Sequence, residues 1–341
     1  MAQVQLADVY SPIVWARTIQ EAQTRQNGFL ASGVAVLDNS ITEKLSGGTS
    51  TITMPQFTGI EDGEPNYSTD DPAQFAVHGK IGTQEQAARS ASRNKSWSTM
   101  TLARELTDSD PEVAITNRIG YYWATDEESR LLCSVTGIKD DNVANDNSDM
   151  VLDVSNDLDP ATDPVTDEQR INATNVILAE QTLGDRKTIL TTIAMHSVQH
   201  TRLRLQGLLT DNFDPQTGAL MYQTYLGKRV LVDDSLPAVV GTNKISYLVV
   251  LFGTGAVGYG PGPVRVPTEV ERIPGSGNGA GQDVIYSRVH TCFHPYGFKW
   301  NNALITPGST FATYDDLKNV NNWSRVVARK NVPMAFLVVN D

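Results

Sequence analysis

The sequence predicts an α+β fold, and three observations support this class. The stretch from Asp110 to Gly137 has the apolar spacing of one long helix. A block from about residue 167 to residue 252 alternates helical and strand patterns, as a compact mixed domain does. Residues 49–97 have the pattern of a long hairpin with too little apolar surface for a core of its own. A chain of 341 residues can therefore hold about two domains together with elongated parts that need other surfaces.

The long helix is predicted from its ends and from its apolar face. Asp110 supplies a capping side chain, and Pro111 suits the first helical turn. Gly137 offers the left-handed conformation that often ends a helix. Apolar residues recur mostly at three- and four-residue spacings, at Ile115, Ile119, Tyr122, Leu131 and Val135. So long a helix with one apolar stripe usually supports other parts of a molecule.

The second half of the chain supplies the elements of the compact domain. The predicted elements are a helix at 167–183, a strand at 188–195, a helix at 198–209, a hairpin at 220–232 and a strand at 245–252. A two-stranded ribbon is predicted at 264–299, with a glycine-rich turn that begins at Pro274. The apolar run after Pro333 predicts a buried strand that returns to the compact domain.

The first 48 residues predict an extended arm with the apolar anchors Trp15 and Phe29 and a short helical pattern up to Arg25. Two hypotheses stay open for this arm. It packs along a neighbouring molecule, or it forms an edge strand on its own domain.

The hairpin at 49–97 has an acidic, turn-rich tip from Gly59 to Pro72, which we expect to carry almost no apolar surface. Its returning strand is predicted between residues 77 and 95, with side chains too polar for a core strand. A short helical connector at 98–106 leads into the long helix.

Composition and charge restrict the function. The formal net charge is −12, with 27 basic and 39 acidic residues and no basic tail, which argues against a protein that grips nucleic acid by its phosphates. Simple acidic solubility explains the charge equally well. No apolar run approaches a membrane span, and the N-terminus lacks the pattern of a secretory signal. Two cysteines, Cys133 and Cys292, give no disulfide framework and suit a reducing cytoplasm.

One motif suggests a nucleotide enzyme. Gly253, Gly255 and Gly258 form a G-x-G-x-x-G run directly after a predicted strand. A dinucleotide site needs a helix to begin inside this motif, and Pro261 and Pro263 break such a helix before its second turn. A glycine-rich turn is the better interpretation, and the dinucleotide-dependent enzyme remains the alternative from another class.

Candidate metal and acid sets are weak. His196 and His200 are spaced to share a helix face but lack the metalloprotease glutamate, whereas His290, Cys292 and His294 share one strand face. The acidic segment 139–167 is predicted to be a loop and lacks the glycine and glutamate of a calcium loop. Asp233 and Asp234 are adjacent on a strand and point to opposite faces. We predict no catalytic residues, no bound metal and no cofactor.

Several runs resemble one known family. The first is WSTMTLA, which begins at Trp97 and leads to Asp110, and it is followed by the residue pairs 122–123 (YW), 131–132 (LL) and 137–138 (GI). The others are GKRVLVDD from Gly227, the strand 247–252 with the GTGA that follows it, and HPYGFKW from His294. In this order, over about two-thirds of the chain, they resemble the major capsid proteins of tailed bacteriophages with the Hong Kong 97-type fold.

The resemblance implies four parts. They are an N-terminal arm at 1–48, an extension loop at 49–97, a peripheral domain at 98–160 and 263–300 that holds the long spine helix, and an axial domain at 161–262 and 301–341. It implies a coat protein that assembles as hexamers and pentamers into an icosahedral shell around double-stranded DNA in the host bacterial cytoplasm. An encapsulin-like shell around a cargo enzyme is an alternative on the same fold.

The resemblance also implies partners. These are other copies of the chain, a portal, decoration proteins and a separate scaffolding protein, since no long segment precedes the arm. Sequence-specific DNA binding and membrane contact are not expected. Covalent cross-linking, known in one branch of the family, makes Lys80 and Lys95 candidates by position only.

Overall fold

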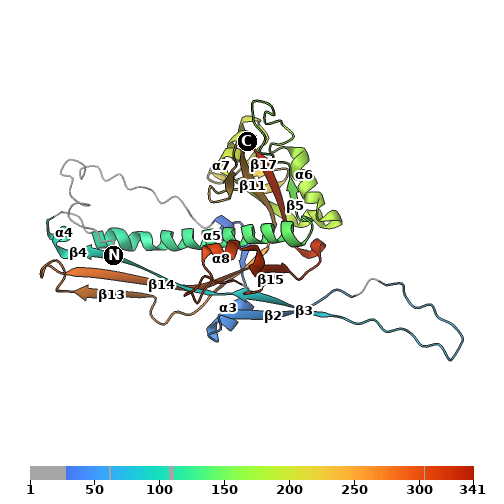
Figure 1. Cartoon of the computed structure of the whole chain (residues 1–341), viewed down its shortest axis with the longest axis horizontal. Helices are drawn as coiled ribbons and strands as arrows, with labels where there is room; N and C mark the ends of the chain where they lie inside the picture. Colours follow the sequence, from blue (N-terminus) through green and yellow to red (C-terminus); the bar gives the residue numbers. More distant parts are fainter. Residues whose placement is uncertain (1–27, 61–62, 107–110, 303) are drawn as a thin grey trace.

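The computed structural model describes residues 28–60, 63–106, 111–302 and 304–341. Figure 1 shows an elongated molecule built along one long helix, with a compact domain above one half of it and a hairpin that projects beyond the same end. Helices and sheets are both present, so the predicted α+β class is confirmed.

The long helix, α5, spans Pro111–Asn145, which corresponds to about 50 Å at 1.5 Å per residue. Leu131 and Val135 of the predicted stripe are buried, and Ile115, Ile119 and Tyr122 are half-buried. The prediction that Gly137 ends the helix is wrong. Gly137 is instead a point of close packing, where a Cβ atom would lie 2.2 Å from the carbonyl oxygen of Leu317. The predicted cap at Asp110 lies outside the described residues.

An eight-stranded sheet forms the compact domain. Its order is β5-β17-β11-β6-β9-β8-β7, with β10 beside β11. The strands are β5 Val151–Asp153, β6 Leu190–Met195, β7 Thr210–Phe213, β8 Leu220–Tyr225, β9 Lys228–Val232, β10 Ala238–Val240, β11 Ile245–Gly253 and β17 Met334–Asn340. The C-terminal strand β17 pairs antiparallel with β11, so its predicted return to this domain is confirmed.

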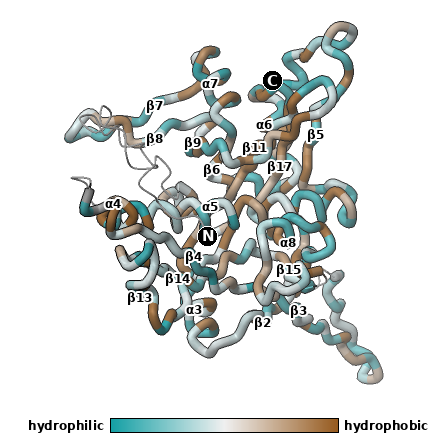
Figure 2. Tube along the Cα trace, turned by 60° about the vertical axis from the view of Figure 1, so that its left-hand side comes forward, coloured by the Kyte–Doolittle hydropathy of each residue, from teal (hydrophilic) through white to brown (hydrophobic). Residues whose placement is uncertain are grey.

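Helices α6 (Ala173–Gln181) and α7 (Ser197–Leu205) pack on one face of this sheet and are shorter than predicted. Asn172 fixes the start of α6, because its side chain accepts a hydrogen bond from the backbone N–H of Asn175 at 2.7 Å. A 3₁₀ turn at Gly184–Ile189 leads into β6. The other sheet face joins the core around α5 through Leu248, Val250 and Phe336. Figure 2 shows hydrophobic residues gathered along the central strands.

A second, five-stranded sheet runs beside α5. Its strands are β1 Ala35–Leu37, β4 Ala91–Met100, β12 Val257–Pro261, β13 Thr268–Ile273 and β14 Gln282–Pro295. β14 is its axis, since it pairs with β13 and β12 along its length and also with β4. The predicted two-stranded ribbon, β13 and β14, is therefore one part of a larger sheet, in which β4 also pairs with β14.

The segment between the two sheets packs on α5. It contains β15 (Phe298–Trp300), α8 (Tyr314–Lys318) and β16 (Trp323–Arg325). Thr313 and Asp316 close a capping box at the start of α8. The indole N–H of Trp323 donates to the carbonyl of Leu317 at 2.8 Å, beside Gly137 of α5. α8 and β16 thus pack against the C-terminal half of the long helix.

Residues 28–48 do not form an extended arm. They fold into α2 (Gly28–Ala31), β1 and α3 (Asn39–Ser46), and Phe29 is fully buried, with its ring 5.9 Å from that of Phe252. The hypothesis that this region packs on its own subunit holds for these residues, because Phe29 finds its apolar surface in the same chain. Trp15 and the helical pattern up to Arg25 lie outside the described residues.

The projecting hairpin consists of β2 (Thr51–Phe57) and β3 (Thr83–Arg89), joined by a long loop. The prediction that the returning strand is too polar for a core is wrong at its root. Gln86, Ala88 and Ser90 are buried, and the polar side chains among them have hydrogen-bond partners. The connector helix α4 (Thr101–Leu106) begins later than predicted, because residues 98–100 still pair in β4.

Candidate functional site

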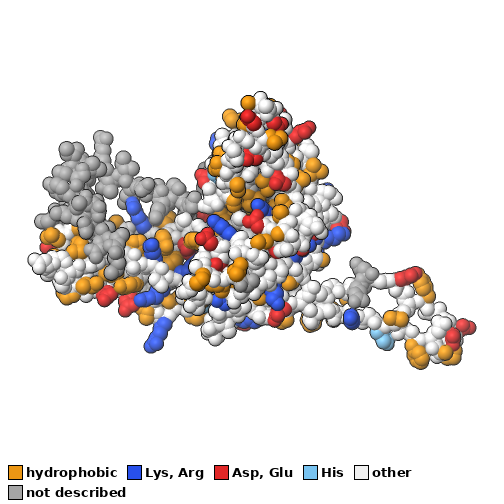
Figure 3. Space-filling view, in the orientation of Figure 1, with side chains coloured by type: hydrophobic (Ala, Val, Ile, Leu, Met, Phe, Trp, Pro, Cys, Tyr) orange, Lys and Arg blue, Asp and Glu red, His pale blue; other side chains and the backbone are white. Residues whose placement is uncertain are grey.

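The loop at the end of the hairpin exposes apolar side chains that its own subunit does not cover. Ile60 is 79% exposed, Tyr67 76%, Phe75 89% and Val77 79%. The expectation of almost no apolar surface between Gly59 and Pro72 is therefore wrong. The many acidic residues of this segment predict a polar surface, but the segment also contains one isoleucine and one tyrosine. Figure 3 shows acidic and hydrophobic side chains mixed over the projecting tip.

The loop is held in shape by its own polar groups. The Asn66 side chain donates to the carbonyl oxygen of Val77 at 2.9 Å and accepts from the N–H of Val77 at 3.2 Å. At the neck of the loop, Thr58 and Gly82 exchange backbone and side-chain hydrogen bonds. These bonds tie the two arms of the loop together at two levels. Large apolar side chains that are exposed together on a projection make it a candidate site of protein–protein contact.

The root of the hairpin is anchored to the body of the subunit. Arg89 donates to the carbonyl oxygen of Thr310 at 2.6 Å, which ties β3 to the segment before α8. Gln86 accepts from the backbone N–H of Gly297 and contacts His294. A buried root and an exposed tip allow the hairpin to act as a fixed arm that reaches beyond its own subunit.

A buried charged cluster fixes α5 against the elongated sheet. Arg93 of β4 forms an ion pair with Asp126, and the Arg130 guanidinium donates to the carbonyl oxygen of Ala312 at 3.0 Å. Burial lowers the pKa of Arg93 to about 10, which is still far enough above neutral pH for the side chain to stay charged. Burial, together with the nearby Glu127 carboxylate, raises the pKa of Tyr259 to about 12. The cluster joins three segments in the middle of the molecule.

The glycine motif does not form a nucleotide site. Gly253 ends β11, Gly255 adopts a φ of +69° in a turn, and a strand, β12, follows where a dinucleotide fold needs a helix. The predicted glycine-rich turn is correct. Because the chain continues as the strand β12 and contains prolines there, no helix begins at the motif whose N-terminus could meet a pyrophosphate.

His196 and His200 do not share a helix face. His196 precedes α7 as its cap, accepting from the N–H of Val198 at 3.3 Å, while the His200 ring contacts Gln223 at 2.6 Å. Among the described residues no group of three or more His, Cys, Asp or Glu side chains is placed to hold a metal ion.

His290, Cys292 and His294 occupy alternate positions of β14, and each has a separate environment. The ring of His290 lies against Gly262, the Cys292 thiol lies 3.5 Å from the carbonyl of Arg89, and His294 bonds to Gln86. Burial raises the pKa of Cys292 to about 12, which keeps it as a thiol rather than a metal-binding thiolate.

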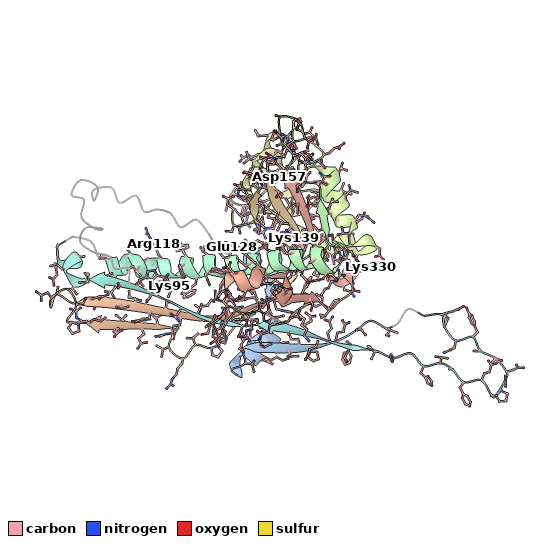
Figure 4. The ribbon with its side chains drawn as sticks, in the orientation of Figure 1. Lys95, Arg118, Glu128, Lys139, Asp157 and Lys330 are labelled. Carbon is pink, nitrogen blue, oxygen red and sulfur yellow. The ribbon has the colours of Figure 1, made fainter. Side chains whose placement is uncertain are left out.

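The acidic segment 139–167 is only partly a loop. Residues 139–145 complete α5, and 151–153 form β5. The Asp157 carboxylate accepts backbone N–H groups of residues 242, 243 and 244, at the upper end of the compact domain (Figure 4), and these bonds lower its pKa. Asp163 pairs with Lys244. These two acids hold loops of their own subunit together.

The remaining candidates also have local environments. Asp233 accepts from the N–H of Ser235, and Asp234 accepts from that of Ser197. Lys80 is exposed in the projecting loop, whereas Lys95 lies on β4 beside α5 (Figure 4), paired in register with Ser287. Among the described helices, none is long and apolar enough to cross a membrane.

The fold has solved counterparts. The capsid protein of cyanophage Pam1 aligns with a TM-score of 0.57 over 95% of this chain and 94% of its own, at 11% identity. A capsid chain of Ralstonia phage GP4 aligns with a TM-score of 0.54 over 78% and 84% of the two chains, at 10% identity. The long helix, the two sheets and the projecting hairpin therefore define a subunit of the Hong Kong 97-type capsid class.

Sequence similarity gives the family. The chain is 32% identical, over 340 residues and 97% of each chain, to the major capsid protein of Bacillus phage SPP1. No model of a protein family matches the chain. The chain belongs to the bacteriophage major capsid proteins, the coat proteins that associate with one another to form the shell of the virion. Members of this family are structural proteins and not enzymes, so the dinucleotide alternative is rejected.

Proposed function

We propose that this coat protein assembles as hexamers and pentamers into an icosahedral shell that encloses the double-stranded DNA of a phage. The projecting loop carries the proposal, because Tyr67 and Phe75 expose apolar surface that no described part of their own subunit covers. A neighbouring copy supplies the missing surface when the loop lies across it.

The net charge supports a container for DNA. With 39 acidic and 27 basic residues, the wall repels phosphate groups overall and does not hold the genome by counterion release. Such a wall lets DNA be packed and released without strong adhesion.

The four parts of the subunit belong to the same proposal. They are the arm at 1–48, the extension loop at 49–97, the peripheral domain at 98–160 and 263–300, and the axial domain at 161–262 and 301–341. The two sheets and the hairpin support the division into an extension loop, a peripheral part and an axial part, whereas residues 28–48 pack on their own subunit. Three segments cross it, because β4 and β12 pair with β14 and α8 packs on α5.

Further partners belong to the same proposal. They are a scaffolding protein, which directs one subunit into both sixfold and fivefold positions, and a portal. Decoration proteins are an optional addition. Assembly in the host bacterial cytoplasm suits two buried, unpaired cysteines.

Replacement of residues 59–72 by a short Gly-Ser turn tests the role of the loop. We expect a soluble subunit that unfolds cooperatively but forms no stable shells, because the hydrogen bonds lost within the subunit, such as those between Asn66 and Val77, lie in the loop itself and the core is left intact. Unfolding of the trimmed subunit would assign the loop to its own core, and normal particles would show that it is no clamp between subunits.

Paired substitutions within the loop identify the attractive surface. We expect Tyr67→Ser with Phe75→Ser to lower the yield of shells, and the matched control Asp70→Asn with Asp71→Asn to leave it largely unchanged. The content of purified particles distinguishes a DNA container from an encapsulin-like shell, which would hold protein cargo.

A further inference from the structure

A cavity of about 320 Å³ opens at the root of the projecting hairpin. It lies between α3, β2 and the turn after β11, and its lining includes Asp38, Met54, Gln56, Gln86, His294 and Tyr296. Figure 1 shows α3 and β2, two of these elements, at the base of the projecting hairpin.

Hydrogen bonds around the cavity determine which nitrogen of His294 carries the proton. The backbone N–H of Gly297 donates to Gln86 Oε1 at 3.1 Å, so this atom is an acceptor. His294 Nε2 lies 3.0 Å from the same oxygen and must therefore donate to it. Gln86 in turn donates to Gln56, which donates to the Tyr296 hydroxyl at 2.8 Å. His294 is thus held with its Nε2 protonated.

The other ring nitrogen, Nδ1, is then a lone-pair acceptor. This atom is buried and has no hydrogen-bond partner among the described residues, and His294 as a whole is only 4% exposed. Burial also lowers the pKa of His294 to about 4, which keeps the ring neutral at physiological pH. A buried acceptor without a partner is rare, and it is satisfied when a donor enters the site.

The surroundings of the cavity select a positively charged donor. The Asp38 carboxylate lies in its lining, and no lysine or arginine is among the described residues that line it. Met54, a flexible side chain, lines the same space. An anion and a neutral acceptor together favour an ammonium or guanidinium group over a carboxylate.

We propose that this pocket binds a lysine or arginine side chain of a second copy of the chain in the shell. The cationic group donates a hydrogen bond to His294 Nδ1 and pairs with Asp38. This inference rests on the proposed shell, in which copies meet around the hairpin, and it adds a specific polar contact to the apolar contact of the loop.

Two substitutions remove the binding groups and preserve the fold. Asp38→Asn keeps the hydrogen bond to the N–H of Ser40 that caps α3, but removes the charge. His294→Gln places an amide N–H near the position of Nε2, so that the bond to Gln86 can persist, but has no acceptor at Nδ1. Asp159→Asn is the matched control, because Asp159 is exposed and makes the same kind of bond to the N–H of Ala161, at 2.9 Å.

We expect shells of both pocket variants to dissociate several degrees below wild-type shells, and Asp159→Asn shells to match the wild type. Thermal dissociation followed by light scattering measures this difference. Unchanged dissociation of both pocket variants would overturn the proposal and leave the shell function intact. Failure of the wild type to form any shell would instead count against the proposed function.

Nitrogen NMR of sedimented wild-type shells labelled in histidine gives a second test. The chain has 5 histidines, so the His294→Gln spectrum identifies the signal. We expect an unprotonated Nδ1 that contacts a lysine or arginine nitrogen. A protonated Nδ1 beside a carboxylate, contact with water alone, or contact with a residue of the same subunit would each contradict the proposal.

Discussion

Gly137 and Gly120 lie on the same helix in opposite surroundings. A Cβ atom on Gly137 would come within 2.2 Å of the Leu317 carbonyl oxygen, whereas one on Gly120 would meet nothing within 4 Å. We expect Gly137→Ala to destabilise the subunit by about 1–3 kcal/mol or more, because α8 must move away from α5. Urea unfolding of the unassembled subunit measures this change.

Gly120→Ala is the matched control for this substitution. In an open helical position alanine is favoured over glycine by about 1 kcal/mol, so this variant should equal or exceed the stability of the wild type. Equal midpoints for the two alanine variants would show that α5 and α8 do not pack closely at Gly137.

His294 predicts a pH dependence of stability. Its pKa is about 4 in the folded subunit, against an ordinary value of 6.5. The unfolded chain therefore binds the proton first as the pH falls, and the contribution to stability, fully present above 6.5, is lost between 6.5 and 4. The expected slope is about 1.4 kcal/mol per pH unit. Burial lowers the pKa of His290 as well, which adds in the same direction.

Denaturant titrations at several pH values, with wild type and His294→Gln compared, isolate the contribution of His294. The variant should lose less stability than the wild type in this window. Parallel pH profiles would mean that His294 is accessible to protons in the folded subunit.

At the level of residues, the sequence predicts turn chemistry better than close packing. The positive φ of Gly255 fits the glycine-rich turn that the local pattern predicts. The role of Gly137 depends on α8, which is 180 residues distant along the chain, so nothing near Gly137 signals it. The pocket around His294 is invisible in the sequence for the same reason, since its lining comes from segments far apart in the chain.

The contact between α5 and β4 gives a prediction at the level of elements. The Arg93 and Asp126 side chains are only 12% and 11% exposed, and Arg93 also lies over the ring of Trp123. We expect Arg93→Met to cost about 3–5 kcal/mol, because the buried Asp126 carboxylate loses its only cationic partner among the described residues and keeps only the hydrogen bond from the Tyr314 hydroxyl. The double variant Arg93→Met with Asp126→Leu should recover much of that loss.

A double-mutant cycle measured by denaturant unfolding tests this coupling. Additive losses in the two single variants and the double variant would show that the pair is not coupled, and that other contacts, such as the hydrogen bond from the Trp123 indole to Ser287 at 2.9 Å, hold α5 on the sheet.

Elements with strong local signals were predicted well. The strand at 245–252, the hairpin at 220–232 and the C-terminal strand appear where their apolar runs predict them. Helix ends were less predictable, because α6 begins after its cap Asn172 and not at residue 167. The five-stranded sheet was missed as a unit, since β4 reads as a polar strand and gains its partners only from β14.

At the scale of the whole molecule, the family resemblance gave more than the residue patterns did. Periodicity predicts a long helix and a hairpin, but it does not place them relative to one another. The acidic composition of the hairpin tip also predicts a polar surface, although the subunit leaves Ile60 and Tyr67 exposed there. How such a loop lies on a neighbour depends on contacts between several copies. The structure of a single chain therefore shows only which side chains of the loop are exposed.

Electron cryomicroscopy of particles formed by the wild-type chain together with a scaffolding protein tests whether the projecting loop joins neighbouring subunits. We expect closed icosahedral shells in which the loop at 58–82 lies across an adjacent subunit, with Tyr67 and Phe75 buried there. Monodisperse monomers under all assembly conditions would contradict it, and so would shells in which this loop folds back onto its own subunit.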